Sequence, residues 1–341
     1  MTQFRFGLMI RGTFPREDDM RVRFREMMEQ VRLIDRLGFD CLTKGSHYST
    51  QEVQEFQQLN FLARAMAEGP NLRLNAGIVL LLLWKPLDLA EQLASLDAMS
   101  DGRMIFGCAL GYRDVEAKAF GAYGVNRVQR FTENLEAVKR LFTEKSVTMK
   151  GSHFELDNAS LSIEPVQKPM PPVWIGANVD AAVARAARLG DCWYINPHQK
   201  LSTLVRQMDI YRRALDEAGK PFPEEFPIRR DMFVARTREE AMRIAEPHIA
   251  DMYRVYRAWG QDKAMAADDR DLNLAWEDLV ADRFLIGSPD EVAEQILTFH
   301  RKLGVNHLIA SVQGTTMPQS QVLDTLHLMA EEVFPKVRQG L

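Results

Sequence analysis

Strand-like and helix-like hydrophobic patterns alternate along the whole chain. Short apolar runs are each followed by a longer segment in which apolar residues recur every three or four positions, as in an amphipathic helix. The expected strands are residues 4–10, 39–43, 72–83, 104–110, 173–175, 191–195, 228–235 and 306–312. The expected helices are residues 20–37, 53–67, 87–99, 129–141, 180–189, 201–218, 238 onward, 289–303 and 321–337. This alternation predicts a parallel sheet covered by helices.

The repeated strand–helix unit favours one (β/α)8 barrel, the TIM-barrel fold, in an α/β protein. A barrel of this kind needs about 250 residues, and a chain of 341 residues leaves room for insertions. We expect a hairpin at 148–161 and a helical insertion at 249–283, at the C-terminal face of the strands. An open doubly wound sheet is disfavoured because residues 11–13 are not a G-x-G-x-x-G turn. No linker interrupts the pattern, so residues 1–341 are expected to form a single domain.

Composition and charge narrow the class of protein. The formal net charge is -4 and no basic stripe is visible, which argues against nucleic acid or an anionic membrane as a partner. The longest apolar run, residues 76–84, is too short to span a bilayer, and no signal-peptide pattern follows Met1. Three widely spaced cysteines argue against a disulfide framework and show no zinc spacing. We therefore expect a cytoplasmic protein without a metal site.

In a barrel the active site lies at the C-terminal ends of the strands. The candidate residues at these ends are Arg11, His47, Trp84, Lys85, Gly111, Tyr112, Arg113, Gly176 to Val179, Asn196, His198, Arg236, Gln313 and Gly314. A histidine placed like His47 can act as an acid or base near neutral pH, although a structural hydrogen bond is the commoner role of a lone histidine.

The turn after the fifth strand is a candidate phosphate site. Gly176, Ala177, Asn178 and Val179 lead from the strand into the next helix, whose first N–H groups can bind an anion. Arg130, in the first turn of an earlier helix, can add a charge-assisted contact. The alternative is an ordinary helix start capped by Asn178.

A glycine inside the third strand also has two interpretations. The pair Gly77-Ile78 interrupts an apolar run, and an isolated glycine in a buried strand often marks a close backbone approach to a ligand. The alternative is a glycine that lets a helix pack closely.

Several longer segments carry a family resemblance. Residues 85–103 read KPLDLAEQLASLDAMSDGR, and residues 171–177 read PPVWIGA. The other matching segments are 106–112, 116, 120–121, the triplet Arg127, Arg130 and Glu133, and residues 286–289, 304–307 and 332–335. In this order and over nearly the whole chain, they resemble the bacterial luciferase-like flavin-dependent monooxygenases.

The resemblance implies a (β/α)8 barrel, usually a homodimer, that uses reduced FMN supplied by a separate flavin reductase. Some members use the deazaflavin F420 instead. The resemblance also implies that Gly77-Ile78 is a cis peptide facing the isoalloxazine, and that Arg130 and the amides of Asn178 and Val179 hold the flavin phosphate. The remaining expected flavin contacts are Met9, Ala109, Gly111, Tyr112, Gly176 and Ala177.

The sequence departs from the luciferase pattern near the expected substrate. His47 falls on the second position of the family's histidine pair, but Ser46 occupies the first, where luciferase has its catalytic histidine. Leu110 stands where luciferase has an arginine, and Lys85 replaces the usual histidine before a proline. Aldehyde chemistry is therefore not expected. The residues expected to shape a different substrate pocket, together with the 249–283 insertion, are Ser46, Trp84, Lys85 and Arg113.

The expected activity is FMN-dependent monooxygenation of a small organic substrate. In the family, reduced flavin reacts with O2 to give a C4a-peroxide, and the protein excludes water and places the substrate. His47 is the expected catalytic residue. An F420-dependent reductase or dehydrogenase is the first alternative, although no long basic groove for the F420 tail is visible. A flavin-binding protein without catalysis is the second alternative.

Overall fold

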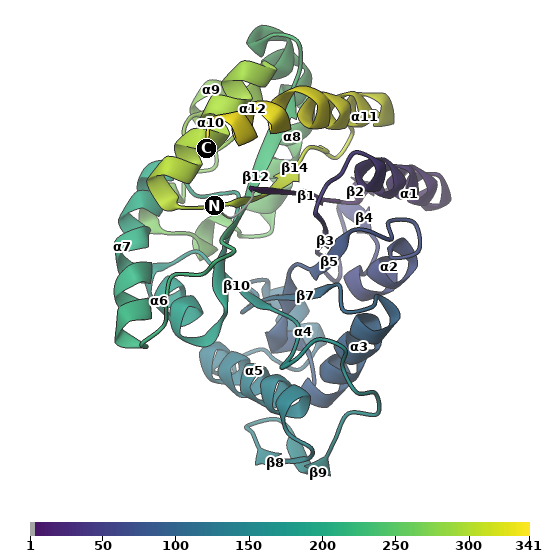
Figure 1. Cartoon of the computed structure of the whole chain (residues 1–341), viewed down its shortest axis with the longest axis vertical. Coiled ribbons are helices and arrows are strands. Elements are labelled where there is room, and N and C mark those ends of the chain that lie inside the picture. The colour runs from purple at the N-terminus through teal and green to yellow at the C-terminus, as the bar shows by residue number, and fades with distance from the viewer. Residues whose placement is uncertain (1–3) are drawn as a thin grey trace.

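Eight parallel strands form a closed barrel in this computed structural model, which describes residues 4–341 (Figure 1). The strands are β1 (Arg5–Met9), β3 (Cys41–Lys44), β5 (Arg73–Ala76), β7 (Met104–Ala109), β10 (Val173–Ala177), β11 (Cys192–Ile195), β12 (Pro227–Val234) and β14 (His307–Ser311). Their order is β10-β11-β12-β14-β1-β3-β5-β7, and β7 also pairs with β10, which closes the ring. The expected (β/α)8 barrel is confirmed, and each expected strand belongs to the ring.

Helices cover the outside of the barrel. They are α1 (Met20–Arg36), α2 (Gln58–Ala65), α3 (Pro86–Met99), α5 (Arg127–Thr143), α6 (Asp180–Leu189), α7 (Leu201–Glu217), α8 (Arg238–Ala258), α10 (Pro289–Leu303), α11 (Gln319–Leu328) and α12 (Phe334–Gln339). Helix α10 shows how the sequence defines such an element. Ser288 and Glu291 form a capping box at its start, and Gly304 ends it with a φ of 79°. Between these ends, Val292, Ile296 and Leu303 are buried.

The expected strand 72–83 is interrupted. β5 ends at Ala76, and the chain continues through the cis Gly77–Ile78 peptide into β6 (Val79–Leu80) and a 3-10 turn (Leu81–Leu83). The resemblance implied this cis bond, and the structure has it. A Cβ atom on Gly77 would lie 2.6 Å from the Asn75 amide nitrogen, so only glycine fits there. Gly77 marked this position in the sequence, although the apolar residues that follow it hid the end of the strand.

Three short elements differ from the expected pattern. Val53–Glu55 is strand β4, paired antiparallel with β2 (Thr13–Pro15), so the helix expected from residue 53 begins only at Gln58. β13 (Leu285–Gly287) was not expected. It pairs with the end of β12, because β14 covers only the first part of that long strand. Helix α4 (Asp114–Ala119) was not expected either.

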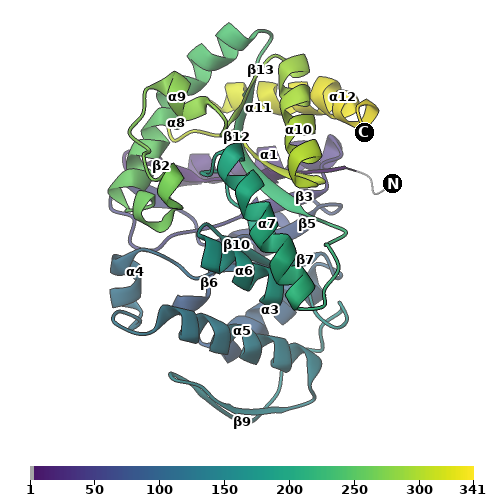
Figure 2. The ribbon, with the colours of Figure 1, turned by 90° about the vertical axis from the view of Figure 1, so that its left-hand side faces the viewer.

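The hairpin and the segment 249–283 lie at different places on the barrel. The expected hairpin is β8 (Val147–Lys150) with β9 (Glu155–Ala159), beside α5 at one end of the molecule in Figures 1 and 2. Residues 249–283 contain the end of α8, two 3-10 turns (Asp262–Ala264 and Ala267–Asp269) and α9 (Trp276–Val280). In Figure 2, α9, α4 and β2 lie on the left of the molecule, on the side opposite both termini.

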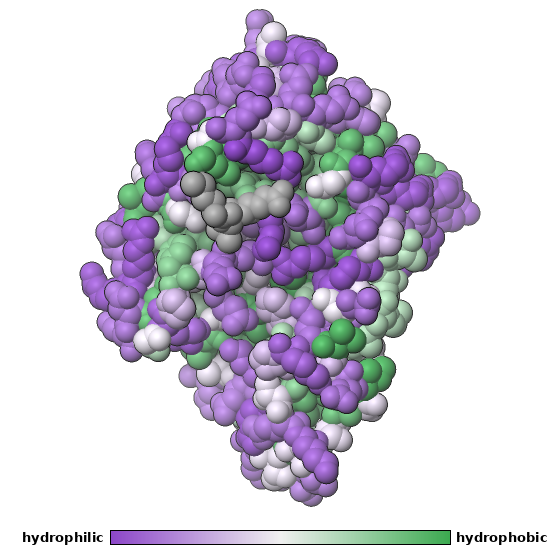
Figure 3. All heavy atoms as spheres, viewed as in Figure 1, coloured by the Kyte–Doolittle hydropathy of each residue, from purple (hydrophilic) through white to green (hydrophobic). Residues whose placement is uncertain are grey.

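The outer surface is mainly polar. Hydrophilic residues cover most of the face in Figure 3, and hydrophobic residues appear there in smaller groups. Within residues 4–341, no helix is both long and apolar enough to span a membrane.

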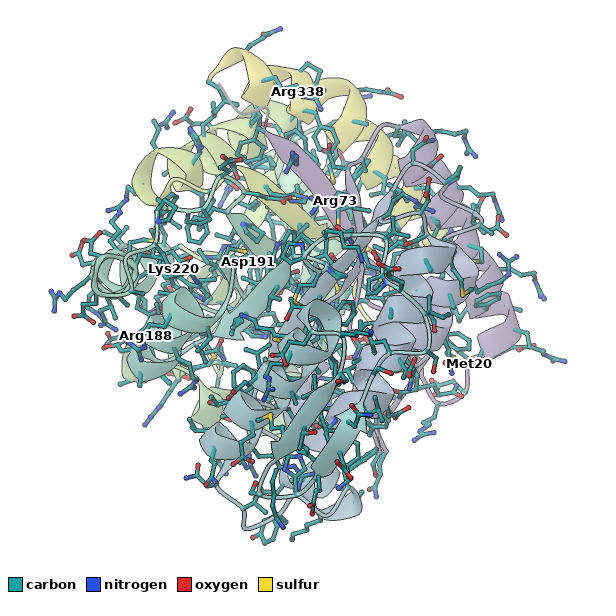
Figure 4. All side chains as sticks on the ribbon, turned by 60° about the horizontal axis from the view of Figure 1, so that its bottom comes forward. Met20, Arg73, Arg188, Asp191, Lys220 and Arg338 are labelled. Carbon is teal, nitrogen blue, oxygen red and sulfur yellow. The ribbon has the colours of Figure 1, made fainter. Side chains whose placement is uncertain are left out.

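A buried ion cluster occupies the N-terminal end of the barrel. Arg73 begins β5 (labelled in Figure 4), and its Nη1 lies 2.6 Å from Oε1 of Glu225. Arg5 and His307, which begin β1 and β14, contact the same oxygen at 3.1 and 2.7 Å. Burial opposes ionisation of Glu225, but the His307 hydrogen bond and the nearby positive charges outweigh it and lower the pKa of Glu225 to about 2.

The substitution Glu225→Gln should destabilise the fold at neutral pH by on the order of 3 kcal/mol. The pKa of this carboxyl is depressed from its usual 4.5 to about 2 in the folded chain, so its stabilisation is complete above pH 4.5 and is lost as the pH falls towards 2. Urea unfolding at pH 7 and at pH 3 measures both effects, and the difference between the two proteins should shrink to about half or less at pH 3, because the folded carboxyl loses its charge only near pH 2. Glu164→Gln, which breaks an exposed pair with Lys168, is the matched control and should change little. A pH-independent gap between wild type and Glu225→Gln would contradict this account.

Candidate active site

A cavity of about 270 Å³ lies at the C-terminal ends of the barrel strands. Most of the residues expected from the sequence line it. These are Met9, Ser46, His47, Gly77, Ile78, Ala109, Gly111, Tyr112, Gly176, Ala177, Asn178 and Val179. The barrel therefore brings residues from opposite ends of the chain to one site, as its topology requires.

Trp84 and Lys85 do not line this cavity. Trp84 packs beside the buried side chains of Leu80, Leu82 and Leu83. Lys85 is exposed, and its ammonium group donates a hydrogen bond to the backbone carbonyl of His153 in the hairpin. Lys85 thus faces the hairpin rather than the cavity.

The start of α6 forms one end of the cavity. Within residues 4–341, no side chain caps this helix. Asn178 does not cap it either, because its amide group contacts Asn196 and the carbonyl of Ala264. Asp180, in the first turn, is paired with Arg206 at 2.7 Å. The first N–H groups of α6 are therefore available to an anion in the cavity.

A cation that the sequence analysis missed lies beside this helix start. Arg185 lines the cavity, with its guanidinium 5.9 Å from the ring centre of Phe131. The signal was present in the sequence, because Val179, Ala182 and Arg185 are spaced three residues apart and so share a helix face.

Arg130 is buried but does not line the cavity. Its Nη1 donates to the carbonyl of Gly121 at 3.3 Å, and its Nε has no hydrogen-bond partner in residues 4–341. Of the two cations near the start of α6, Arg185 is the one that reaches the cavity.

Ile78, Ala109 and Gly176 pack together into one apolar surface of the cavity, referred to as the slot. Ile78 follows the cis bond, and a Cβ atom on Gly176 would lie only 2.5 Å from its Cδ1 and 3.5 Å from the Cβ of Ala109. The Tyr112 hydroxyl, also at the cavity, is buried without a hydrogen-bond partner in residues 4–341. A flat ring system with a phosphate-bearing tail fits this arrangement, because the slot is apolar and the helix start donates N–H groups.

His47 is held by a buried carboxylate on the other side of the cavity. Its Nδ1 lies 3.1 Å from Oε1 of Glu116, which is in α4. The same oxygen accepts hydrogen bonds from the backbone N–H of Tyr48 at 2.8 Å and from Arg113 at 3.1 Å. Burial opposes ionisation, but these bonds and charges outweigh it and lower the pKa of Glu116 below its usual 4.5. The His47 Nδ1–H therefore donates to Glu116, and Nε2 remains free to exchange a proton.

Arg113 supports this carboxylate instead of lining the cavity. Its guanidinium also donates to the carbonyl of Tyr48 at 2.7 Å and lies 4.5 Å from the ring centre of Trp259. Trp259 packs edge-on against the His47 ring at 5.0 Å, and its Nε1 donates to Glu52 at 3.0 Å. The segment that follows α8 therefore covers the His47–Glu116 pair.

A second histidine lines the cavity through a different set of bonds. His198 Nδ1 lies 3.2 Å from the hydroxyl of Tyr253, which donates to Asp231 at 2.9 Å. Asp231 also forms an ion pair with Arg11. Burial lowers the pKa of His198 to about 3, so its imidazole is neutral at pH 7.

Sequence reasoning missed several residues of this site. Glu116, Tyr253 and Asp231 act through residues far away in sequence, so spacing gives no signal for them. The segment after the middle of α8 adds Tyr256, Trp259, Gln261 and Ala264 to the lining. Within residues 4–341 no group of three or more His, Cys, Asp and Glu side chains is arranged to hold a metal.

The fold and this site together define a TIM-barrel oxidoreductase with a cavity suited to a phosphate-bearing aromatic cofactor. The sequence model of the luciferase-like monooxygenases matches residues 4–307, and the chain belongs to that family. An FMNH2-dependent dimethylsulfone monooxygenase of Pseudomonas fluorescens is 27% identical over 93% of this chain and 84% of its own.

Solved structures agree with this assignment. The monooxygenase RslO1 of Streptomyces bottropensis has a TM-score of 0.84 and 27% identity, covering 97% of this chain and 99% of its own. The oxygenating constituent of the Pseudomonas putida 3,6-diketocamphane monooxygenase, solved with FMN, has a TM-score of 0.83 and 19% identity. An F420-dependent secondary alcohol dehydrogenase has a TM-score of 0.80 and 18% identity. Each of these last two covers 98% of this chain and 99% of its own, and each likeness shows the fold alone.

The His198 imidazole should not titrate between pH 5 and 8, because burial holds its pKa near 3. NMR of histidine-labelled protein, with the resonance assigned through His198→Gln, measures this directly. The unfolded chain binds the proton more readily, so His198 also lowers the free energy of unfolding as the pH falls below 6.5. A sigmoidal shift of this resonance centred between pH 5 and 8 would contradict the prediction, because it would show that the His198 ring is accessible to water.

Proposed function

We propose that this protein is the oxygenase of a two-component system that uses reduced FMN and O2 to oxygenate a small organic substrate. The observation that carries the proposal is one cavity with an uncapped helix start and a cation at one end and the His47–Glu116 pair at the other. The family supports the class of reaction, and the names of its relatives support FMN.

The cofactor would be held from its phosphate to its ring. The N–H groups that begin α6, together with Arg185, would bind the phosphate, because a dianion gains most from a helix dipole and an unpaired guanidinium. Ile78, Ala109 and Gly176 would pack against one face of the ring. When bound, reduced FMN supplies the electrons that activate O2. A separate flavin reductase would deliver it.

The other residues of the cavity would control protons and water. His47 can give or take a proton at Nε2, because Glu116 fixes its ring and balances the charge of the protonated form. Trp259 covers this pair, which keeps water away from it. His198 stays neutral, so it can accept a hydrogen bond at Nε2 without bringing a charge into the cavity.

Arg185→Gln should weaken binding of reduced FMN by at least about tenfold and leave riboflavin binding unchanged, because only FMN has the phosphate. Anaerobic fluorescence titration with both flavins measures the difference. The control is Arg188→Gln, which removes a cation from the same helix but not from the cavity lining. A parallel titration with F420 tests the cofactor. Tighter binding of F420 than of FMN would replace the monooxygenase proposal with a deazaflavin-dependent reductase or dehydrogenase.

His47→Ala should lower turnover by about 100-fold with little change in FMN affinity, because a positioned acid or base contributes that much to a proton transfer. Glu116→Gln should lower kcat less and should shift the pH dependence of kcat, since a neutral amide stabilises protonated His47 less well. Oxygen consumption under single-turnover conditions measures both variants. Equal losses of FMN binding and turnover in His47→Ala would assign this residue to the cofactor site instead of the reaction.

A further inference from the structure

Two arginines line the cavity on the side opposite the flavin slot. Arg11 follows β1 and Arg229 is in β12, which lie on either side of β14 in the ring. The slot residues Ile78, Ala109 and Gly176 belong to the neighbouring segments β5–β6, β7 and β10. The arginines therefore face the cofactor slot from across the barrel.

Both guanidinium groups keep buried N–H groups that nothing binds. Within residues 4–341, the Nε of Arg11 and the Nε and Nη2 of Arg229 are buried without a hydrogen-bond partner. Arg11 is only 3% exposed. Arg130, Arg230 and Arg283 also have buried N–H groups without a partner in residues 4–341, but none of them lines the cavity, whereas a ligand in the cavity can reach those of Arg11 and Arg229. Binding them would recover their desolvation energy.

The charges around these arginines do not balance. Asp231 is paired with Arg11 and accepts a hydrogen bond from Tyr253. Glu55, the carboxylate that lines the cavity, is paired with Lys44 at 3.0 Å. No carboxylate of residues 4–341 lies within 4.0 Å of the Arg229 guanidinium. One positive charge is therefore left over on this side of the cavity.

The surroundings of Arg229 keep it charged. Burial opposes its protonation, but the hydroxyl groups of Tyr256 and Tyr194 and the charge of Asp231 outweigh burial and raise its pKa. An uncompensated charge in a largely apolar cavity is unfavourable until an anion enters. The walls facing it include Met9, Tyr112 and other apolar or aromatic residues, which suit an organic body attached to that anion.

We propose that Arg229, assisted by the Nε of Arg11, binds an oxyanion group on the substrate, so that the substrate class is a small organic carboxylate or sulfonate. The proposal rests on the proposed function for the identity of the reaction, but the binding step can be tested separately. Arg229 would orient the substrate with its anionic end in the barrel and its organic part between the flavin slot and His47.

The test is calorimetric titration of the purified protein with benzoate and with benzamide, which has nearly the same shape but no charge. Hexanoate and hexanesulfonate extend the set to flexible anions. At least one anion should bind saturably, benzamide should bind at least about tenfold more weakly than benzoate, and Arg229→Gln should weaken anion binding by about tenfold or more. Arg229→Lys, which keeps the charge, should retain part of the affinity and shows whether the site tolerates replacement.

Matched controls separate this site from the phosphate end of the cavity. Arg185→Gln should leave benzoate affinity unchanged. Failure of the wild-type protein to bind any of the three anions, equal affinity for benzoate and benzamide, or an equal loss of benzoate affinity in Arg185→Gln and Arg229→Gln would overturn the proposal.

A cofactor role for Arg229 gives a different result. In that case Arg229→Gln would weaken reduced FMN and leave the anions unaffected, which would also overturn the proposal. If the wild-type protein does not bind reduced FMN, in contrast, the proposed function is overturned. The anion titrations would still show whether Arg229 binds a carboxylate or sulfonate.

Discussion

The pairing of β7 with β10 is the constraint on which the rest of the structure depends. These two strands close the ring, so that residues from every strand end converge on one cavity. Closure also places Ala109 and Gly176 next to Ile78, because β7 pairs with both β10 and β6. An open sheet of the same strands would place Gly176 of β10 at one edge and Ile78 and Ala109 at the other, with the strands of the two arginines between them.

Charge inside the barrel is organised around the same closure. At the N-terminal end, Glu225 gathers Arg73, Arg5 and His307 into one cluster. At the C-terminal end, Glu116 holds His47 directly. Asp231 holds His198 through the hydroxyl of Tyr253. Buried ions are tolerated in these clusters because each carboxylate accepts several hydrogen bonds. Arg130, Arg230 and Arg283 are also buried without an ion pair in residues 4–341, but none of the three lines the cavity, whereas Arg229 does.

The sequence predicted the barrel well for a physical reason. Strands covered on both faces must be apolar throughout, so β1, β7 and β14 appear as continuous hydrophobic runs. The short β13 gave no such signal, since it has only three residues and its register is set by pairing with β12. Gly77 and the family resemblance marked the position of the break, but the end of the strand was hidden because Val79 and Leu80 continue the apolar run.

For much of the site, the sequence predicted where a residue lies in the barrel but not which way its side chain points. The strand-end rule and the family resemblance found His47 and the turn after β10, but neither shows where a long side chain points. Arg113 turns back to Glu116, and Lys85 turns to the hairpin, because each finds an acceptor there. Arg185 was overlooked although its spacing from Val179 and Ala182 indicated a shared helix face. Arg229 was missed because only the folded barrel shows that it faces the cavity.

The two histidines of the cavity differ because their partners differ. His47 hydrogen-bonds directly to Glu116, a carboxylate that stays ionised despite its burial. His198 reaches Asp231 only through a neutral phenol, and Arg11 already claims that carboxylate, so burial dominates and the ring stays uncharged. The same side chain thus serves two purposes. One is held directly by a carboxylate, while the other offers a fixed lone pair beside a site that already has a positive charge in excess.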